Sequence, residues 1–431
     1  MSDGPPLEPP TAEQKAISRR DLDRSAVKGL AWTGGVRTLT QSVQWIAALL
    51  VVRLLTPEDY GLVAMAGAYF GLVRMFSEFG LGAAIVQRRD LTESQVARLG
   101  GFSILSGTVL ALVSLAASSL VAAFFGEPRV QSIVMVLSVT FVLTGVDVVP
   151  RSLLRRDLDF RRLAWIQASQ NFAFAGLSLT LAAIGFGYWS LVLAGLGGSM
   201  VRMTMALAVR RHPVAFPREI DTIRSELWFG AHVVVTQLAL YIRQFSDVLV
   251  VGRVLGTEAL GAYNVAWQQA NVIVERVSPI VSEVSAAVLA ASQNDRAGLR
   301  RYVKMFTEGI ALLAFPATFG LAVVADDFVA LIFGDEWLPA IGPLRILALV
   351  AAFRSITPVL SQVLIATDQA KKNMQFAVAG SVVIPVMLYV GSRWGITGVA
   401  LGWLVGHPLV MGTVLLRYAL QTTELSLMGY L

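Results

Sequence analysis

The chain has 431 residues, of which 55% are apolar and 15% are charged, against roughly 25% charged residues in soluble domains. Its mean hydropathy of +0.65 excludes a soluble globular enzyme and a disordered or nucleic-acid-wrapping chain. The absence of cysteine excludes disulfides and thiolate chemistry, the three histidines are scattered, and no GxxxxGK[ST] nucleotide-binding loop occurs. The composition therefore indicates an all-α polytopic membrane protein, with apolar sequence for about twelve spans of about 20 residues each.

Residues 1–27 form a polar, proline-containing segment that we expect to be a disordered cytoplasmic tail. It lacks the apolar core of a cleaved signal peptide, so the first span is expected to act as the insertion signal. Runs of apolar residues predict twelve spans, at 29–52, 60–86, 99–125, 130–150, 163–184, 188–209, 227–251, 259–291, 305–333, 340–366, 374–391 and 396–416.

The distribution of positive charge predicts the orientation of these spans. With a cytoplasmic N-terminus, 24 of the 35 Lys and Arg residues fall in cytoplasmic segments and four fall outside, at Arg53, Arg129, Arg253 and Arg393. The remaining seven lie within spans, and of these Arg202 and Arg345 are near span ends and are expected to reach the membrane interface. This bias places both termini in the cytoplasm and requires an even number of spans.

A short internal repeat divides the chain into two halves. Residues 53–66 match residues 253–266 at five of fourteen positions, and both stretches fall in the outer turn after the first span of a half. Six spans per half is an even number, so both halves enter from the cytoplasm, which predicts a parallel repeat of two six-helix lobes around a central cavity. The expected parts are an N-lobe at 28–209, a cytoplasmic linker at 210–226, a C-lobe at 227–420 and a tail at 421–431.

Charged residues inside spans point to a functional cavity. Each costs about 2.5–3.5 kcal/mol on insertion scales, so lipid exposure is improbable. Two Arg–acid combinations are spaced i,i+4, which favours a hydrated cavity for a charged substrate over simple local neutralisation. Because arginine binds phosphate oxygens through a planar fork of donors, the candidate substrate-binding residues are Arg37, Arg74, Arg243, Arg276 and Arg354.

The acids of the same spans leave two roles open. The candidates for coupling to a proton or sodium gradient, or for structural counter-ions, are Glu78, Asp147, Asp247 and Glu275. Two locations are open for the side chain of Arg37, which lies about two turns from the cytoplasmic side. It can either face a cavity or extend to the membrane interface. No catalytic residue and no metal site is predicted.

The chain resembles the bacterial polysaccharide transporter or oligosaccharide flippase family of the multidrug/oligosaccharidyl-lipid/polysaccharide flippase superfamily, and most resembles the colanic acid exporter type. The similar stretches occur in order along nearly the whole chain, at 29–32, 60–62, 76–88, 153–160, 253–256, 261–264, 332–337 and 344–347. They include Gly29-Leu30-Ala31-Trp32, Tyr60-Gly61-Leu62 and Ile332-Phe333-Gly334-Asp335-Glu336-Trp337. Members often carry about two further helices, whereas twelve are expected here.

This resemblance implies a transporter in the bacterial cytoplasmic (inner) membrane rather than an enzyme. It would move a polyprenyl-diphosphate-linked oligosaccharide repeat unit across the membrane by alternating access, for exopolysaccharide, capsule or O-antigen biosynthesis. It implies no bound cofactor, and coupling to a proton or sodium gradient. The implied partners are the lipid-linked oligosaccharide, membrane lipids, and the polymerase and glycosyltransferases of the pathway, but no nucleic acid.

Two other functions remain as alternatives. A proton- or sodium-coupled multidrug exporter of the same superfamily is disfavoured, because such proteins look built around acids in the first lobe and span one here contains Arg37 and no acid. A polysaccharide ligase or polymerase typically carries a large outer loop with catalytic residues. The longest predicted outer loop here, 326–339, is only about fourteen residues long and acidic, so this alternative is the weaker one.

Overall fold

The computed structural model describes most of the chain between Ser42 and Glu424. Within these residues the backbone is helical, and the helices are joined by short turns without any strand. The described residues are 42–77, 82, 85–86, 91–215, 241–293, 295–424 and 426. Arg37, Glu78, the predicted N-terminal tail and most of the predicted linker lie outside them, and the predicted C-terminal tail is described only at 421–424 and 426.

The first half of the chain forms one helical bundle. Within it α4 packs along α5, α6 packs along α7, and α2 contacts both α4 and α5. Its helices are Ser42–Leu54, α2 (Pro57–Ser77), α4 (Glu93–Phe125), α5 (Arg129–Arg156), α6 (Phe160–Ala183) and α7 (Trp189–Val209).

The second half forms a second bundle, in which α12 packs on α9 and α10, and α13 packs on α14. Its helices are 241–254, α9 (Thr257–Ala291), α10 (Arg296–Val323), α11 (Ala325–Ile332), α12 (Ile341–Ala366), α13 (Ala370–Gly391), α14 (Gly395–Val410) and α15 (Arg417–Thr423). Short 3-10 helices, η2 (Asp335–Ala340) and η3 (Ser392–Trp394), connect some of them, and a π-helical segment, η4 (Met411–Leu416), joins α14 to α15.

Local sequence signals set several helix ends. Thr92 and Gln95 form a capping box at the start of α4, in which each side chain accepts a hydrogen bond from the other residue's backbone N–H. The same helix ends at Gly126 in a left-handed conformation, as glycine allows without a steric cost. Asp295 accepts hydrogen bonds from the backbone N–H groups of Ala297 and Gly298 at the start of α10.

Each predicted span overlaps at least one of these helices. Six helical stretches of the described residues are long and apolar enough to cross a membrane: Glu93–Phe125, Arg129–Arg156, Trp189–Val209, Arg296–Val323, Asp335–Ala366 and Lys371–Thr423. The prediction of an all-α, multi-pass membrane protein is therefore confirmed. The count of twelve spans and the boundaries of the four parts stay predictions.

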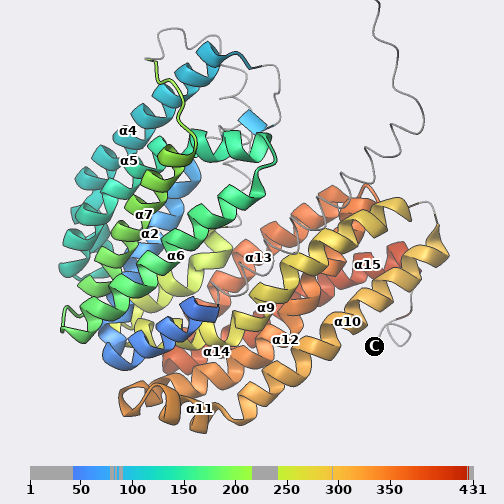
Figure 1. Cartoon of the computed structure of the whole chain (residues 1–431). Coiled ribbons are helices and arrows are strands. Elements are labelled where there is room, and N and C mark those ends of the chain that lie inside the picture. The colour runs from blue at the N-terminus through green and yellow to red at the C-terminus, as the bar shows by residue number, and fades with distance from the viewer. Residues whose placement is uncertain are drawn as a thin grey trace, which may run out of the picture.

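The two bundles meet through α2 and α9. Figure 1 shows them in contact near the end of the molecule that carries α11 and diverging away from that end. On the side of the contact, Trp337 donates a hydrogen bond from its indole nitrogen to the carbonyl oxygen of Val52 in the other bundle, at 3.1 Å. Arg253 donates from Nη1 to the carbonyl oxygens of Phe124, at 2.6 Å, and Ala123, at 3.3 Å. These bonds bind the C-terminal bundle to backbone of the N-terminal bundle.

Candidate functional site

A cavity of about 370 Å³ lies between the two bundles. Both halves of the chain line it, and none of the lining residues is charged: they are Gln44, Ala47, Ala48, Val51, Tyr60, Val63, Ala64, Gly67, Ala68, Phe174, Ala175, Ser178, Leu191, Phe245, Val248, Asn264 and Gln268. The amide side chain of Gln268 donates a hydrogen bond to Asn264 one turn earlier on α9. The cavity is thus an apolar and aromatic pocket with a few neutral hydrogen-bonding groups.

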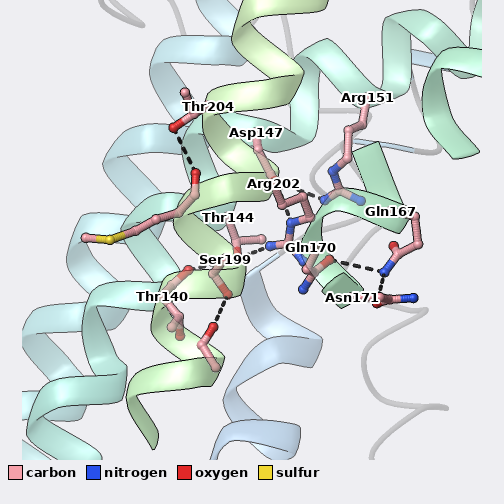
Figure 2. A network of polar contacts seen from close by, with 12 residues as sticks. Thr140, Thr144, Asp147, Arg151, Gln167, Gln170, Asn171, Ser199, Arg202 and Thr204 are labelled. Atoms are coloured by element: carbon pink, nitrogen blue, oxygen red, sulfur yellow. Dashed lines mark hydrogen bonds and ion pairs between the residues drawn. The ribbon is translucent and has the colours of Figure 1, made fainter. Parts of the chain in front are cut away.

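A charged cluster lies in the N-terminal bundle around Asp147, whose side chain is fully buried. Asp147 accepts from Arg151 Nη2 at 2.9 Å and from Arg202 Nε at 2.5 Å, so α5 and α7 are bridged by one carboxylate and two guanidinium groups. Arg202 also donates to Thr144 at 3.3 Å. Figure 2 shows the two arginines converging on Asp147 next to the amide side chains of Gln167, Gln170 and Asn171 on α6, which the picture also labels.

The position of Arg202 corrects one expectation from the sequence. We expected its side chain to extend to the membrane interface, but it is only 11% exposed and is held by Asp147. A buried cation of this kind needs a counter-ion, and Asp147 supplies it from 55 residues away in the chain. The i,i+4 spacing of Asp147 and Arg151 was a usable sequence signal for half of this cluster, whereas the partner on α7 had none.

A second cluster surrounds Arg354 on α12 in the C-terminal bundle. Its guanidinium carbon lies 4.5 Å from the ring centroid of Trp267 and 5.4 Å from that of Trp403, and its Nη1 donates to Asn271 Oδ1 at 2.9 Å. Two indole faces and one amide therefore hold the cation in place. Arg354 also lies within electrostatic range of Arg243, Asp247 and Glu275, so three of the predicted charges gather around it.

Arg243 and Asp247, which are spaced i,i+4, contact different partners in the described structure instead of pairing with each other. Arg243 lies over the ring of Phe376 on α13, 5.5 Å from its centroid. Asp247 is 2% exposed and accepts hydrogen bonds from the Val248 backbone N–H, at 2.8 Å, and from the Tyr263 hydroxyl, at 3.4 Å. The spacing places both residues on one helix face, but their side-chain partners lie on two different helices, Phe376 on α13 and Tyr263 on α9.

The remaining candidates are more exposed. Arg74, near the end of α2, and Glu275 and Arg276, on α9, have exposed side chains in this conformation. Arg345, which we expected near the interface, is half exposed and pairs with Asp326 at 2.5 Å. No cluster of His, Cys, Asp or Glu in the described part of the chain could hold a metal ion.

Both charged clusters lie on the same side of the cavity. Along α9 the cavity residue Gln268 is followed one turn later by Asn271, the partner of Arg354. Along α6 the cavity residue Phe174 is one turn from Asn171 and Gln170, beside the Asp147 cluster. In both bundles this is the direction in which the bundles diverge (Figure 1). The site is therefore a neutral cavity at the closed end, followed by a layer of arginines toward the open end.

A model of the polysaccharide biosynthesis protein family matches residues 50–342, well over half of the chain. The chain belongs to this family. It is 24% identical over 394 residues to the lipopolysaccharide biosynthesis protein WzxC of Escherichia coli, an alignment that covers 89% of this chain and 79% of WzxC.

Two solved structures show that the fold is a transporter fold. The lipid II flippase MurJ in an inward closed conformation superimposes with a TM-score of 0.76 at 16% identity, covering 93% of this chain and 89% of MurJ. An inward-facing multidrug resistance transporter of the MATE family superimposes with a TM-score of 0.71 at 17% identity, covering 89% of this chain and 95% of the transporter. The family member described here thus has the two-bundle fold of these solved membrane transporters, and the predicted polysaccharide family is confirmed.

Proposed function

We propose that this protein is a flippase that moves a polyprenyl-diphosphate-linked oligosaccharide across the cytoplasmic membrane for surface polysaccharide biosynthesis. The observation that carries the proposal is the layer of arginines beside an uncharged cavity between the bundles, in a chain of the polysaccharide biosynthesis family. The fold it shares with MurJ, a lipid II flippase, supports a lipid-linked substrate.

The arginine layer suits the diphosphate. The Asp147 cluster has two arginines for one carboxylate, so it carries one surplus positive charge that an anionic phosphate oxygen can neutralise. In the C-terminal bundle, Trp267 and Trp403 fix the plane of the Arg354 guanidinium without consuming its charge. Guanidinium groups held in this way are preorganised for bidentate binding of phosphate.

The neutral cavity suits the sugars. Its amides and hydroxyl groups, on Gln44, Ser178, Asn264 and Gln268, can donate and accept hydrogen bonds from sugar hydroxyl groups, and Tyr60 and Phe174 offer ring faces. A volume of about 370 Å³ lies within the usual range for small-molecule sites. The polyprenyl tail would stay in the lipid between the bundles, because its transfer into water is unfavourable.

The direction of transport follows from the charge of the loops. The positive-inside bias supports an orientation with both termini in the cytoplasm, in which the arginine layer lies on the cytoplasmic side of the cavity. The diverging ends of the bundles then face the cytoplasm, where glycosyltransferases of the pathway deliver the lipid-linked unit. After transport, a polymerase on the outer side of the membrane would receive it. Coupling to a proton or sodium gradient, with Asp147, Asp247 or Glu275 as candidate sites, is part of the same proposal and involves no bound cofactor.

Reconstitution tests this proposal directly. Purified protein in proteoliposomes should move a fluorescent polyprenyl-diphosphate oligosaccharide between leaflets, and replacement of Arg37, Arg74 and Arg243 by Ala should abolish the movement. The matched control replaces the cytoplasmic residues Arg161, Arg301 and Lys371 by Ala, which removes the same charge outside the spans. Unchanged transport in the first variant would remove these arginines from the site, and no transport by the wild-type protein would remove the function.

A multidrug exporter is the second candidate, because the MATE family has the same fold. Cationic drugs would have to pass the surplus positive charge around Asp147, which disfavours them. Drug-resistance profiling of a deletion strain separates the two functions. Loss of surface polysaccharide with unchanged drug tolerance supports the flippase.

A further inference from the structure

A second cavity of about 370 Å³ lies at the end of the C-terminal bundle, away from the site between the bundles. Four separate segments line it: the turn after α9, the first turn of α10, the α12–α13 connection with the start of α13, and α15. The lining residues are Gln293, Arg296, Leu299, Thr367, Gln369, Lys372, Gln421 and Thr422. Two are cations, one is apolar, and none is an acid.

Hydrogen bonds hold these walls together. The amide nitrogen of Gln369 donates to the hydroxyl of Thr422 on α15, at 2.7 Å, and Thr422 in turn donates to the carbonyl oxygen of Tyr418, at 2.8 Å. On the other side, Arg300 Nε donates to the carbonyl oxygen of Thr423 at 3.2 Å, which ties α10 to α15. The cavity is therefore a built pocket between three helices rather than a gap between mobile side chains.

The two cations reach the pocket from different walls. Lys372 Nζ lies 4.6 Å from the ring centroid of Tyr418, which positions the ammonium group without neutralising it. Arg296 pairs with Glu424, which also lies 3.9 Å from Arg300, so one carboxylate is shared by two arginines. Counting Glu424 against Arg296, Arg300 and Lys372 leaves a surplus of positive charge at the pocket.

The position of the pocket defines its environment. The first turns of α10 alternate buried Leu299 and Val303 with exposed Arg301 and Lys304, as expected for a helix that enters the bilayer from a basic boundary. The loop charges place this boundary on the cytoplasmic face, whose leaflet is rich in anionic lipid. The pocket offers the cations Arg296 and Lys372 and the side-chain amides of Gln293 and Gln421. At this boundary, such a pocket is matched to a phosphodiester with an acyl tail.

We propose that this pocket binds the phosphate headgroup of an anionic phospholipid of the cytoplasmic leaflet, through Arg296 and Lys372, and that the bound lipid stabilises the association of α10, α13 and α15. The shared chemistry is a phosphate group, which a soluble phosphate could also supply. The lipid is the favoured source, because the apolar wall at Leu299 and the neighbouring bilayer accept its acyl chains. This proposal does not depend on the substrate that the protein transports.

Thermal unfolding of the purified full-length protein in a neutral detergent tests the proposal. Added phosphatidylglycerol should raise the melting midpoint of the wild type more than added phosphatidylcholine does. In Arg296→Gln/Lys372→Gln the affinity for phosphatidylglycerol should fall about thirtyfold, on the basis of roughly one kilocalorie per mole for each cation near the surface. The matched control is Arg301→Gln/Lys371→Gln, which removes the same charge from the same two helix starts and should behave as the wild type.

The measured quantity is the shift of the melting midpoint that the lipid causes within each variant, so a lower midpoint without lipid does not affect it. If the double variant fails to fold, Lys372→Gln alone replaces it. Equal affinity in the pocket variant and the control overturns the pocket. An equal rise with inorganic phosphate or glycerol 3-phosphate overturns the lipid as the ligand. Native mass spectrometry should show phosphatidylglycerol retained by the control and lost from the pocket variant.

Discussion

Gly61 and Gly261 face each other across the contact between the two bundles, and each approaches backbone on the other side. A Cβ atom added to Gly61 would overlap the carbonyl oxygen of Thr257, and one added to Gly261 would overlap the carbonyl oxygen of Pro57. The four positions are related by the 200-residue offset of the repeat, so residue 61 contacts 257 just as 261 contacts 57. Such reciprocal contacts are the mark of a two-fold interface, here between two halves of one chain.

The first prediction concerns this contact. Gly61→Ala or Gly261→Ala should prevent the close approach of α2 and α9 and so destabilise the conformation in which the bundles touch at this end. Overpacking typically costs about 1–3 kcal/mol, which shifts a two-state equilibrium by about 5- to 150-fold. Distance measurements between spin labels on the two bundles should show that the ends near α11, which carry this contact, move apart. Transport should fall.

The control for this prediction is Gly309→Ala on α10, where an added Cβ meets nothing within 4 Å. It changes the same residue type inside a helix without touching the contact. If the spin-label distances at the ends near α11 in Gly61→Ala equal those of the wild type, the prediction is wrong. The contact would then be open for most of the time in the wild type as well.

The second prediction concerns the cluster around Asp147. Asp147→Asn leaves Arg151 and Arg202, which are 17% and 11% exposed, without a counter-ion, and breaking a buried pair in this way typically costs about 3–5 kcal/mol. We expect a large loss of stability in denaturant unfolding. Removing Arg202 as well, in Asp147→Asn/Arg202→Gln, should restore part of it, because fewer uncompensated charges remain.

Asp157 provides the matched control for this change. It pairs with Arg210 at 3.2 Å, but both side chains are more than 40% exposed. Exposed pairs contribute about 0–1 kcal/mol, so Asp157→Asn should have little effect. Similar losses in the two variants would show that burial of Asp147 is not what makes its charge important.

The sequence predicted those features that depend on local composition. Runs of apolar residues predicted the long helices of the two bundles, but they did not predict α15 and they merged α10 and α11 into one span. The repeat predicted two related halves, and Gly61 and Gly261 make reciprocal contacts between them. These predictions succeed because a span must be apolar along its own length and a helix must satisfy its own backbone, whatever its neighbours are.

The sequence could not predict the partners of the charged side chains. Arg243 and Asp247 share a helix face, yet Arg243 lies over Phe376 while Asp247 bonds to Tyr263. Arg202 is bound to a carboxylate 55 residues away. Long side chains choose partners among all helices within reach, and that choice depends on how the helices pack. Local spacing in the sequence therefore identified residues of the arginine layer but not the side chains with which they pair.

The third prediction is a dependence on acid pH in the turn between α4 and α5. Glu127 accepts two hydrogen bonds from the Arg129 guanidinium, at 2.8 and 3.0 Å, and these bonds lower the pKa of its carboxyl group below the ordinary value of 4.5. A lowered pKa in the folded state stabilises the protein fully above the unfolded-state value. This contribution is lost as the pH falls below 4.5 and through the folded-state pKa.

Unfolding of the wild type and of Glu127→Gln over an acid pH series measures this contribution. The wild type should be more stable than the variant at neutral pH, and the difference should shrink as the pH falls below 4.5. Glu258→Gln, at an exposed acid in the first turn of α9, is the control and should show a smaller change. A difference between wild type and Glu127→Gln that is constant across the series would mean that the ion pair with Arg129 contributes nothing.

The last prediction separates charge from geometry at Arg354. Arg354→Lys keeps the positive charge but loses the planar group that lies over Trp267 and Trp403 and the hydrogen bond to Asn271. A cation–π contact contributes about 0.5–2 kcal/mol and a hydrogen bond about 1 kcal/mol, so transport should fall by at least about tenfold. Arg345→Lys, at an exposed pair with Asp326, should transport as the wild type does. If Arg354→Lys is fully active while Arg354→Gln is inactive, the site requires only a positive charge, and the two indole rings serve packing rather than orientation of a phosphate-binding group.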